Sequence, residues 1–539
     1  MIMFGVSITV VVVIVVGIWI ARKVDGDSAN FLVAGRSLGV PLVSASLVGA
    51  AVDANATVGN TDLTSQFGFW SGASLALGLA ICLTLTGTFL AKPMNAMKLF
   101  TLADYFRLRF SRTTEVLSSV IMIFSFVILL AGNLVACGFL MERFAGMPYA
   151  VGILVSLALV FAYTVAGGLF SDAYTAMIQT VITIVAAISL LWWVATTYGI
   201  IIPEGMGPFD LGQLTDPAQG SAINWATLFA LGVGDIVAID FMQRVFGAKN
   251  PQTARRACYS SAVITATVGV IFALVALAGV SAGFTADDGP ILYAMLGDAA
   301  PPIIAIFVLS GIIAASFSTA SGAMLATSAI AVRNIAGVRR TAEHDHDPLL
   351  RWTRLIMVPI SLAGAFLAIQ VAQTGILLTL AFDLMLVCLA GPFITSVFWK
   401  RPGVRAMLIS AVVGLVVRMT FLALTPTLYG VENNILYIPN DLITADFDGW
   451  ATLLAFVISY GVFLLVAWLS PRSEAEYADY ARVRSALDEE QVGMDTQAMR
   501  IITAPREEVP HRAERAADAV LDVTVAAEEA EAPLAADKP

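Results

Sequence analysis

Apolar runs long enough to cross a lipid bilayer recur along almost the whole chain, and this feature constrains the fold more than any other. A transmembrane helix needs about 20 mostly apolar residues. Thirteen runs reach or approach this length, at 2–21, 38–66, 68–91, 116–141, 149–166, 173–198, 225–245, 260–284, 302–332, 352–373, 375–399, 404–424 and 449–470. Charged residues supply only 13% of the chain, about half their share in soluble domains. The sequence therefore predicts an all-α integral membrane protein with about 13 transmembrane helices, multi-pass in the cell membrane, and it argues against a soluble enzyme or a nucleic-acid binder.

The placement of basic residues predicts the orientation of these helices. Twenty Lys and Arg residues follow the odd-numbered runs, whereas the loops on the other side hold Arg143 alone among several acidic residues. Because Lys and Arg accumulate in cytoplasmic loops, we expect the N-terminus outside and the C-terminus inside. Residues 471–539 hold 8 basic and 16 acidic groups, a balance of −8 within the net charge of −10. This polar segment predicts an acidic, largely disordered cytoplasmic tail.

Two of the runs are interrupted near their middle by small and polar residues. The first, 38–66, contains a stretch from Gly49 to Asn60 that is a poor lipid-facing helix, and the second, 225–245, contains Gly234 and Asp235. The two runs are five apart in order, so they cross the membrane in opposite directions. Paired interrupted helices in two inverted halves are typical of secondary transporters. The alternative to such a pair is two unrelated helices, each made flexible by its glycine residues.

Carboxylates inside membrane spans are costly and usually functional. The runs contain four that lie well inside, namely Asp53, Asp235, Asp240 and Asp383. None has an obvious basic partner in the membrane. Arg418 is the only basic residue deep in a run, and we expect its long side chain to reach the outer interface. Asp172, just before the run 173–198, fits an N-cap as well as it fits a cation site.

The positions of the histidines and the absence of certain motifs exclude other mechanisms. All three histidines, His344, His346 and His511, lie outside the runs, so a histidine proton relay within the membrane is excluded. The sequence contains no P-loop and no candidate nucleophile, base or metal cluster. An enzyme and a directly ATP-driven pump are therefore not expected.

Six segments, in order along the chain, resemble motifs of the sodium/solute symporter family. They are NFLVAGRSLG (30–39), TLADYFRLRF (101–110), YTVAGGLFSDAYTAMIQ (163–179), QRVFGAKNPQTARRA (243–257), AASFSTASGAMLATSAIAVRNI (314–335) and FWKRPG (398–403). The resemblance implies a leucine-transporter-type fold with a ten-helix core of two inverted five-helix repeats, each beginning with a broken helix. It divides the chain into an N-terminal helix and cytoplasmic loop (1–37), two repeats (38–198 and 199–400), two extra helices (401–470) and the tail (471–539).

The resemblance also implies a site for a co-transported sodium ion. Carried onto this sequence, the ligands are Gly49, Val52, Ala315, Ser318 and Thr319. Backbone carbonyls at a helix break and neighbouring hydroxyls are the oxygen ligands that a hard cation prefers. Relatives with an additional cation site carry Asp where this chain has Ala176, and Asp172 lies one turn earlier. A second sodium site is therefore not expected.

The two central carboxylates suggest the chemistry of the solute. A buried charge costs at least a few kcal/mol unless it is compensated, so Asp53 and Asp235 are either protonated or neutralised by a cation. One sodium ion offsets one carboxylate, which leaves room for a cationic group on the solute. We therefore predict an amine-bearing solute, such as an amino acid or polyamine, bound by Asp53, Asn55, Asp235 and Asp383. For Asp383 the alternative role is a bond to a neighbouring helix.

The expected function is sodium-coupled symport of a small organic solute by alternating access, with sodium, the solute and the lipid bilayer as the partners. Two alternatives remain open. One is a proton-coupled transporter with Asp53 or Asp235 as the proton carrier. The other is a transporter-like sensor, although the short tail contains no recognisable output domain.

Overall fold

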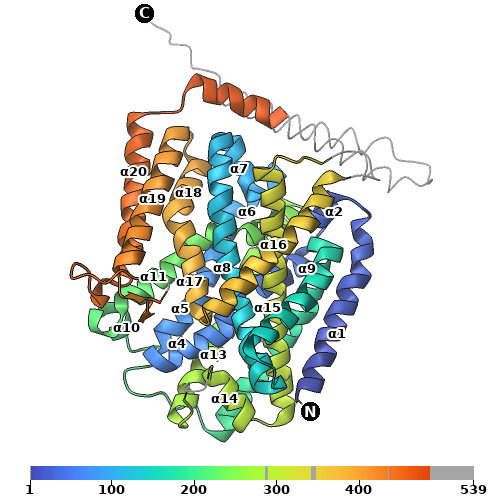
Figure 1. Cartoon of the computed structure of the whole chain (residues 1–539), viewed down its shortest axis with the longest axis vertical. Helices are drawn as coiled ribbons and strands as arrows, with labels where there is room; N and C mark the ends of the chain where they lie inside the picture. The colour runs from blue at the N-terminus through green and yellow to red at the C-terminus, as the bar shows by residue number, and fades with distance from the viewer. Residues whose placement is uncertain (1, 286–288, 341–346, 435, 486–539) are drawn as a thin grey trace, which may run out of the picture. The chain divides into compact units, whose positions relative to one another are not determined.

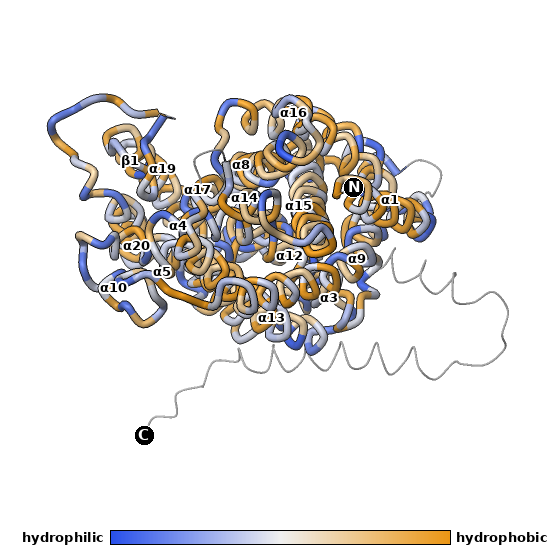
Figure 2. Tube along the Cα trace, turned by 90° about the horizontal axis from the view of Figure 1, so that it is seen from below, coloured by the Kyte–Doolittle hydropathy of each residue, from blue (hydrophilic) through white to orange (hydrophobic). Residues whose placement is uncertain are grey.

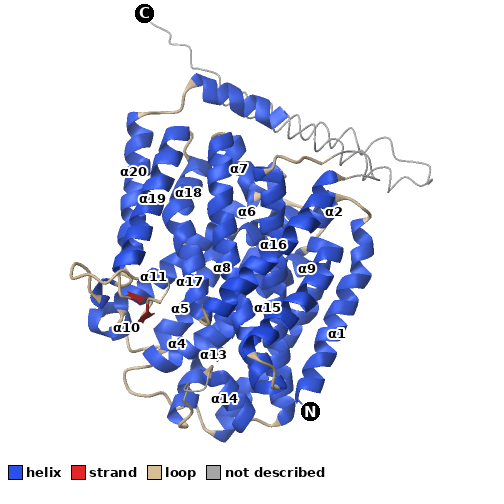
Figure 3. Ribbon diagram, in the orientation of Figure 1, coloured by secondary structure: helices blue, strands red, loops and turns tan. Residues whose placement is uncertain are grey.

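The computed structural model describes residues 2–285, 289–340, 347–434 and 436–485. The three histidines and the tail from residue 486 lie outside this part of the chain. Helices make up most of the described residues (Figure 3). The one named sheet within them is a hairpin of two short strands, β1 (Thr427–Leu428) and β2 (Val431–Glu432). The predicted all-α fold class is confirmed.

Ten helical segments in the described part of the chain are long and apolar enough to cross a membrane. They contain α1 (Ile2–Ile20), α5 (Phe69–Leu85), α8 (Arg112–Ala145), α9 (Tyr149–Thr197), α13 (Pro251–Ser281), α15 (Pro302–Ile330), α16 (Pro348–Gln370), α17 (Thr374–Met385) with α18 (Gly391–Phe398), α19 (Val404–Leu424) and α20 (Trp450–Leu469). Large apolar side chains on peripheral helices such as α1 are exposed where lipid would cover them. Figure 2 shows hydrophobic residues along the helices and hydrophilic residues gathered in many of the connecting segments.

Helix α9 accounts for two of the predicted spans. Its 49 residues would extend about 70 Å at 1.5 Å per residue, more than twice the hydrocarbon thickness of a bilayer. The chain leaves helical geometry inside it at Gly168, with φ 51° and ψ −140°. A Cβ atom at this position would lie 2.3 Å from the carbonyl oxygen of Phe31, so only glycine fits. The sequence predicted the two spans, and they meet at this break at Gly168.

The two interrupted runs form the two bent helix pairs of the described structure. The first pair joins α3 (Val40–Ala51) to the π-helical turn η3 (Asn55–Gly59) and α4 (Asn60–Phe67), with a bend of 56°. The second pair joins α11 (Ser221–Gly232) and η6 (Gly234–Val237) to α12 (Ile239–Gly247), with a bend of 46°. When each bent pair counts as one span and α9 as two, the described residues contain the thirteen spans that the sequence predicts.

The chain forms further short elements, some in the connecting segments and some within the spans. These are η1 (Ala21–Val24), α2 (Ser28–Val33), η2 (Ala34–Arg36), the π-helical η4 (Thr86–Leu90), α6 (Ala91–Met97), α7 (Leu102–Arg109), α10 (Gly212–Thr215), η5 (Pro217–Gln219), α14 (Ile291–Asp298), the π-helical η7 (Ala331–Ile335) and η9 (Leu386–Ala390), and η10 (Ala445–Phe447). Helices α2 and α7 lie at one end of the bundle, and α10, α14 and the N-terminus lie at the other (Figure 1). This separation agrees with the alternation of basic and acidic loops.

Candidate functional site

The first helix break meets the serine-rich helix α15 through a threonine. The Thr319 hydroxyl lies 3.1 Å from the carbonyl oxygen of Gly49, 3.2 Å from that of Ala50 and 3.4 Å from that of Ala315. All four residues are buried. Residues about 270 positions apart in the sequence therefore place three carbonyl oxygens around one hydroxyl.

Ser318 lies at the same contact with its hydroxyl unused. Its Oγ is buried and has no hydrogen-bond partner among the described residues. A Cβ atom at Gly49 would lie 2.7 Å from this Oγ, so the absence of a side chain at Gly49 is what allows the close approach. Val52 lies at the break itself, where the backbone leaves helical geometry with φ −98° and ψ 67°. The residues of the predicted sodium site thus gather around one helix break, with several oxygen atoms directed at it.

Asp53, which follows Val52, is held by donors that carry no charge. Its Oδ2 accepts hydrogen bonds of 2.7 Å from the side-chain amides of both Asn55 and Asn133, and its Oδ1 accepts one of 2.9 Å from the backbone N–H of Ala56. Asn133 belongs to α8 and was not identified from the sequence. These three bonds offset part of the cost of burying the carboxylate, and none of the donors is a positive side chain.

Asp235, at the second break, has no such support. The residue is completely buried in η6, and no amide, hydroxyl or charged donor among the described residues bonds to its carboxylate oxygens. The one neighbouring donor in the described structure is the Cys82 thiol, and a thiol is a weak donor. Asp240 and Asp53 lie close enough to it to interact electrostatically, and both are acidic. Buried carboxylates are normally paired or hydrogen-bonded, which makes Asp235 the most anomalous polar group in this region.

The expectation that no membrane carboxylate has a basic partner is wrong for Asp240 and Asp172. Arg244, one turn after Asp240 in α12, is completely buried. Its guanidinium lies 2.9 Å from Asp172 and 3.1 Å from Asp240, and it also donates to Ser46. Asp172 lies inside α9 and bonds to Arg244 rather than capping a helix. Arg244 lies at the end of the run 225–245, where a basic residue is expected to belong to the cytoplasmic loop.

Ala176 faces the contact between α3 and α15. A Cβ atom at Gly49 would lie 3.3 Å from the Cβ of Ala176, so an acid at position 176 would adjoin the proposed sodium ligands. The nearest substitute is Asp172, and Arg244 already engages its Oδ2. The absence of a second sodium site stays a prediction.

Arg418 is also paired, which corrects its predicted placement at the interface. The side chain is 5% exposed, and its Nε lies 2.5 Å from Oδ2 of Asp383. The pair links α19 to α17 and neutralises Asp383. The structure therefore gives Asp383 the bond to a neighbouring helix that was its alternative role, and leaves Asp53 and Asp235 as the central carboxylates without a cationic partner in the described structure.

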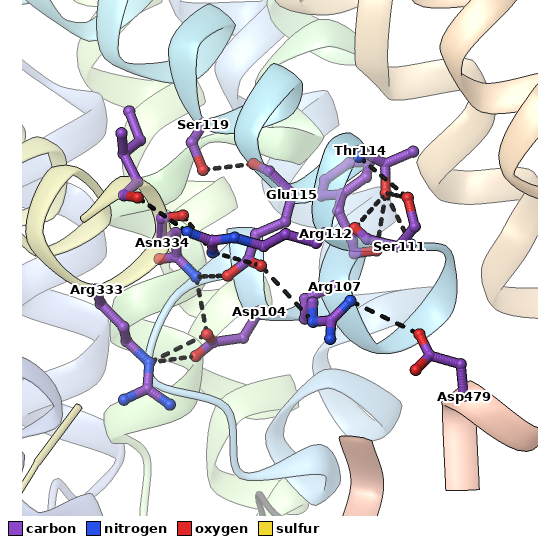
Figure 4. Close-up of polar contacts among 12 residues, drawn as sticks. Asp104, Arg107, Ser111, Arg112, Thr114, Glu115, Ser119, Arg333, Asn334 and Asp479 are labelled. Carbon is purple, nitrogen blue, oxygen red and sulfur yellow. Dashed lines mark hydrogen bonds and ion pairs between the residues drawn. The ribbon is translucent and has the colours of Figure 1, made fainter. Parts of the chain in front are cut away.

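The motif TLADYFRLRF (101–110) takes part in a polar network around α7 (Figure 4). Asp104 in α7 lies 2.9 Å from Arg333 of η7 and accepts a hydrogen bond from Asn334, whose amide also donates to Glu115 of α8. Burial alone would raise the pKa of Asp104, but the charges of Arg333 and Arg339 and the bond from Asn334 lower it overall. The carboxylate thus stays ionised and ties α7 and α8 to the end of α15.

The same motif also contacts FWKRPG. The Arg109 guanidinium donates to the carbonyl oxygens of Ser396, Trp399 and Lys400, at 3.2, 3.1 and 2.8 Å. Two motifs that carry the resemblance are therefore structural partners at one end of the bundle. Nearby, Arg107 lies 3.6 Å from Asp479 in the helix formed by residues 474–485 (Figure 4).

Comparisons with known proteins identify the class of protein to which this architecture belongs. The model of the sodium:solute symporter family matches residues 31–414. The chain belongs to the sodium:solute symporter family. It is a multi-pass membrane transporter and not an enzyme, as the sequence predicted.

Curated relatives in this family transport different solutes. The chain is 26% identical over 421 residues to the high-affinity proline transporter PutP of Bacillus subtilis, covering 74% of this chain and 87% of the relative. It is 22% identical over 495 residues to the high-affinity choline transporter 1 of Torpedo marmorata, covering 85% of this chain and 84% of the relative.

A solved structure supports the fold. The chain superposes on a Na+-coupled sialic acid symporter in a substrate-bound outward-open state with a TM-score of 0.67, covering 88% of this chain and 98% of that chain at 16% identity. At this identity the likeness establishes the shared fold.

Proposed function

We propose that this protein is a sodium-coupled symporter that takes up an amine-bearing solute by alternating access. The observation that carries the amine assignment is the pair of buried central carboxylates, Asp53 and Asp235, without a basic partner among the described residues. Of the other membrane carboxylates, Asp383 is neutralised by Arg418. Asp172 and Asp240 both pair with Arg244. A cationic group on the solute is the simplest charge to complete the centre.

Sodium coupling rests on the oxygen cluster at the first break. Sodium is a hard cation that favours oxygen ligands. The carbonyl oxygens of Gly49, Val52 and Ala315 and the hydroxyls of Ser318 and Thr319 are the proposed set. The unused hydroxyl of Ser318 and the bonds of Thr319 to three of the surrounding carbonyls support it.

The charge of a cavity at one end of the bundle supports a cationic solute. A cavity of about 730 Å³ lies at the end of the bundle that carries α10, between the ends of α4, α11 and α17. Its lining includes Glu204, Asp446 and Asp448, together with the aromatic residues Tyr429 and Trp450, and contains no lysine or arginine. In the proposed orientation this end faces outward, where acidic walls would concentrate cations.

Proton coupling is the second candidate, and Asp235 is the observation that favours it. A buried carboxylate without a partner is the kind of group that carries a proton in transporters. In that case Asp235 would be neutral for part of the cycle, and solute uptake would respond to pH rather than to sodium.

A panel of solutes tested for thermal stabilisation of the purified protein separates these possibilities. We expect an amine-bearing member to raise the melting temperature, and to do so more strongly in sodium than in potassium chloride at one pH. Stabilisation by a neutral or anionic solute alone would contradict the amine assignment. Equal stabilisation in both salts would contradict sodium coupling.

A further inference from the structure

The centre of the molecule contains buried hydrogen-bond acceptors that lack donors. The side-chain oxygens of Asn55 and Asn133 have no partner within the described structure. Both carboxylate oxygens of Asp235 lack an amide, hydroxyl or charged donor there, and the one neighbouring donor is the weak Cys82 thiol. The three residues are at most 1% exposed. An acceptor left unsatisfied in this way typically costs about 1–3 kcal/mol, so an occupant that supplies donors would be strongly favoured.

These acceptors lie around Asp53. Asn55 and Asn133 both donate to the same Asp53 oxygen, which places their amide groups side by side. Asp235 interacts electrostatically with Asp53, and both breaks, η3 and η6, pack against α17. The free oxygen of Asn55 is bordered by Gly132, where a Cβ atom would come within 2.6 Å of it. The acceptors therefore belong to one region between the two helix breaks.

The donors of this region are already used. The amides of Asn55 and Asn133 bond to Asp53, and that of Asn133 also reaches the Leu129 carbonyl oxygen. What remains available is a set of oxygens that accept, close to two carboxylates. Such a set suits a cation with N–H groups. A quaternary ammonium has no N–H group to offer and is typically recognised by aromatic ring faces.

We infer that the solute carries a primary or secondary ammonium group, whose N–H donors bond to Asp235 and to the amide oxygens of Asn55 and Asn133. This inference rests on the proposed amine transport and narrows it. Asp53 contributes charge and fixes the two amides so that their oxygens are free. Asn133 is thereby assigned as a residue that selects solutes by their N–H groups.

Matched methylation series test this inference on the purified full-length protein in sodium chloride. Suitable series are proline, N-methylproline and proline betaine, then glycine through glycine betaine, and ethanolamine through choline. Each step removes an N–H donor, and the last member keeps a positive nitrogen without any. For the scaffold that binds, we expect loss of the last N–H to weaken affinity by about tenfold or more, the typical effect of losing a hydrogen bond to a charged group.

Variants show which residues cause the difference in affinity between the members of a methylation series. Asp235→Asn and Asn133→Leu should weaken the parent amine while leaving the quaternary member little changed, so that the series flattens. Asp62→Asn is the control, because the Asp62 carboxylate already accepts a bond from the Ile291 backbone N–H, and it should leave the slope of the series intact. Melting temperatures without solute check that each variant is folded. If Asn133→Leu does not fold, the loss of the affinity differences along the series in Asp235→Asn is enough to test the inference.

Two results would overturn the inference in distinguishable ways. A quaternary member that binds as tightly as its parent, in the wild-type protein, contradicts the N–H assignment but leaves amine transport standing. A neutral or anionic solute that binds when no amine does contradicts the proposed function as well.

Discussion

At the scale of single residues, the sequence located the acidic groups but not their partners. Asp53, Asp235 and Asp383 stand out because a carboxylate in an apolar run is rare. The pairs of Arg244 with Asp172 and of Arg418 with Asp383 could not be predicted, because each joins residues of different helices. Asp172 lies 72 positions from Arg244, and Asp383 lies 35 from Arg418. Only the packed helices bring these charges together, so which carboxylates remain without a cation is a property of the tertiary structure.

Arg244 gives a direct test of the buried ion pairs. Arg244→Gln leaves Asp172 and Asp240 without a cation, and breaking a buried pair in this way typically costs about 3–5 kcal/mol. We expect a markedly lower melting temperature in detergent. The exposed Arg256 provides the control, and Arg256→Gln should melt close to wild type. Equal melting temperatures for the two variants would contradict the structural role of Arg244.

The sodium ligands can be tested in the same way. Ser318→Ala and Thr319→Ala each remove a proposed ligand, and we expect the sodium concentration for half-maximal uptake to rise by about tenfold or more, since even outer-shell partners of a metal typically matter that much. Ser316→Ala is the matched control, because its hydroxyl bonds back to the Ile312 carbonyl of its own helix. An unchanged sodium dependence in the Ser318/Thr319 double variant would place the site elsewhere.

At the scale of helices, hydrophobic length predicted the spans, and the mixture of small and polar residues predicted both breaks. Neither hydrophobic length nor composition could show that the two spans of α9 meet at a break at Gly168. At this break the carbonyl oxygen of Phe31, in α2, lies close to the Gly168 backbone. The short helices α2 and α7 were also not predicted. They are held by contacts such as the hydrogen bond from the Ser28 N–H to Asp347, 319 positions apart. Hydrophobic periodicity along the sequence does not predict such long-range contacts.

A substitution at Gly168 tests the break between the two spans of α9. Gly168→Ala adds a methyl group that meets the Phe31 carbonyl oxygen, in a backbone conformation that costs other residues about 1–3 kcal/mol. We expect a clear loss of thermal stability. In Gly461→Ala, by contrast, the added atom meets nothing within 4 Å in α20, and alanine is the better helix former. If Gly168→Ala melts no lower than Gly461→Ala, the described break is wrong.

At the scale of the whole molecule, the alternation of charged loops predicts an orientation that cysteine labelling can test. The four native cysteines are buried, so background labelling should be low. Ala218 and Ala336 are exposed at the ends where α10 and η7 lie. We expect Ala218→Cys to react with an impermeant reagent added to intact cells and Ala336→Cys to react only after lysis. Equal reaction of both before lysis would contradict the predicted orientation.

Sodium-driven accumulation is the central claim for the whole molecule, and gradient-driven uptake into proteoliposomes tests it most directly. The purified protein is reconstituted with equal pH on both sides, and uptake of a labelled amine chosen from the stabilisation panel is followed under an inward sodium gradient. We expect accumulation above the external concentration, which disappears when potassium replaces sodium. Accumulation that persists without sodium and follows an inward proton gradient would contradict it.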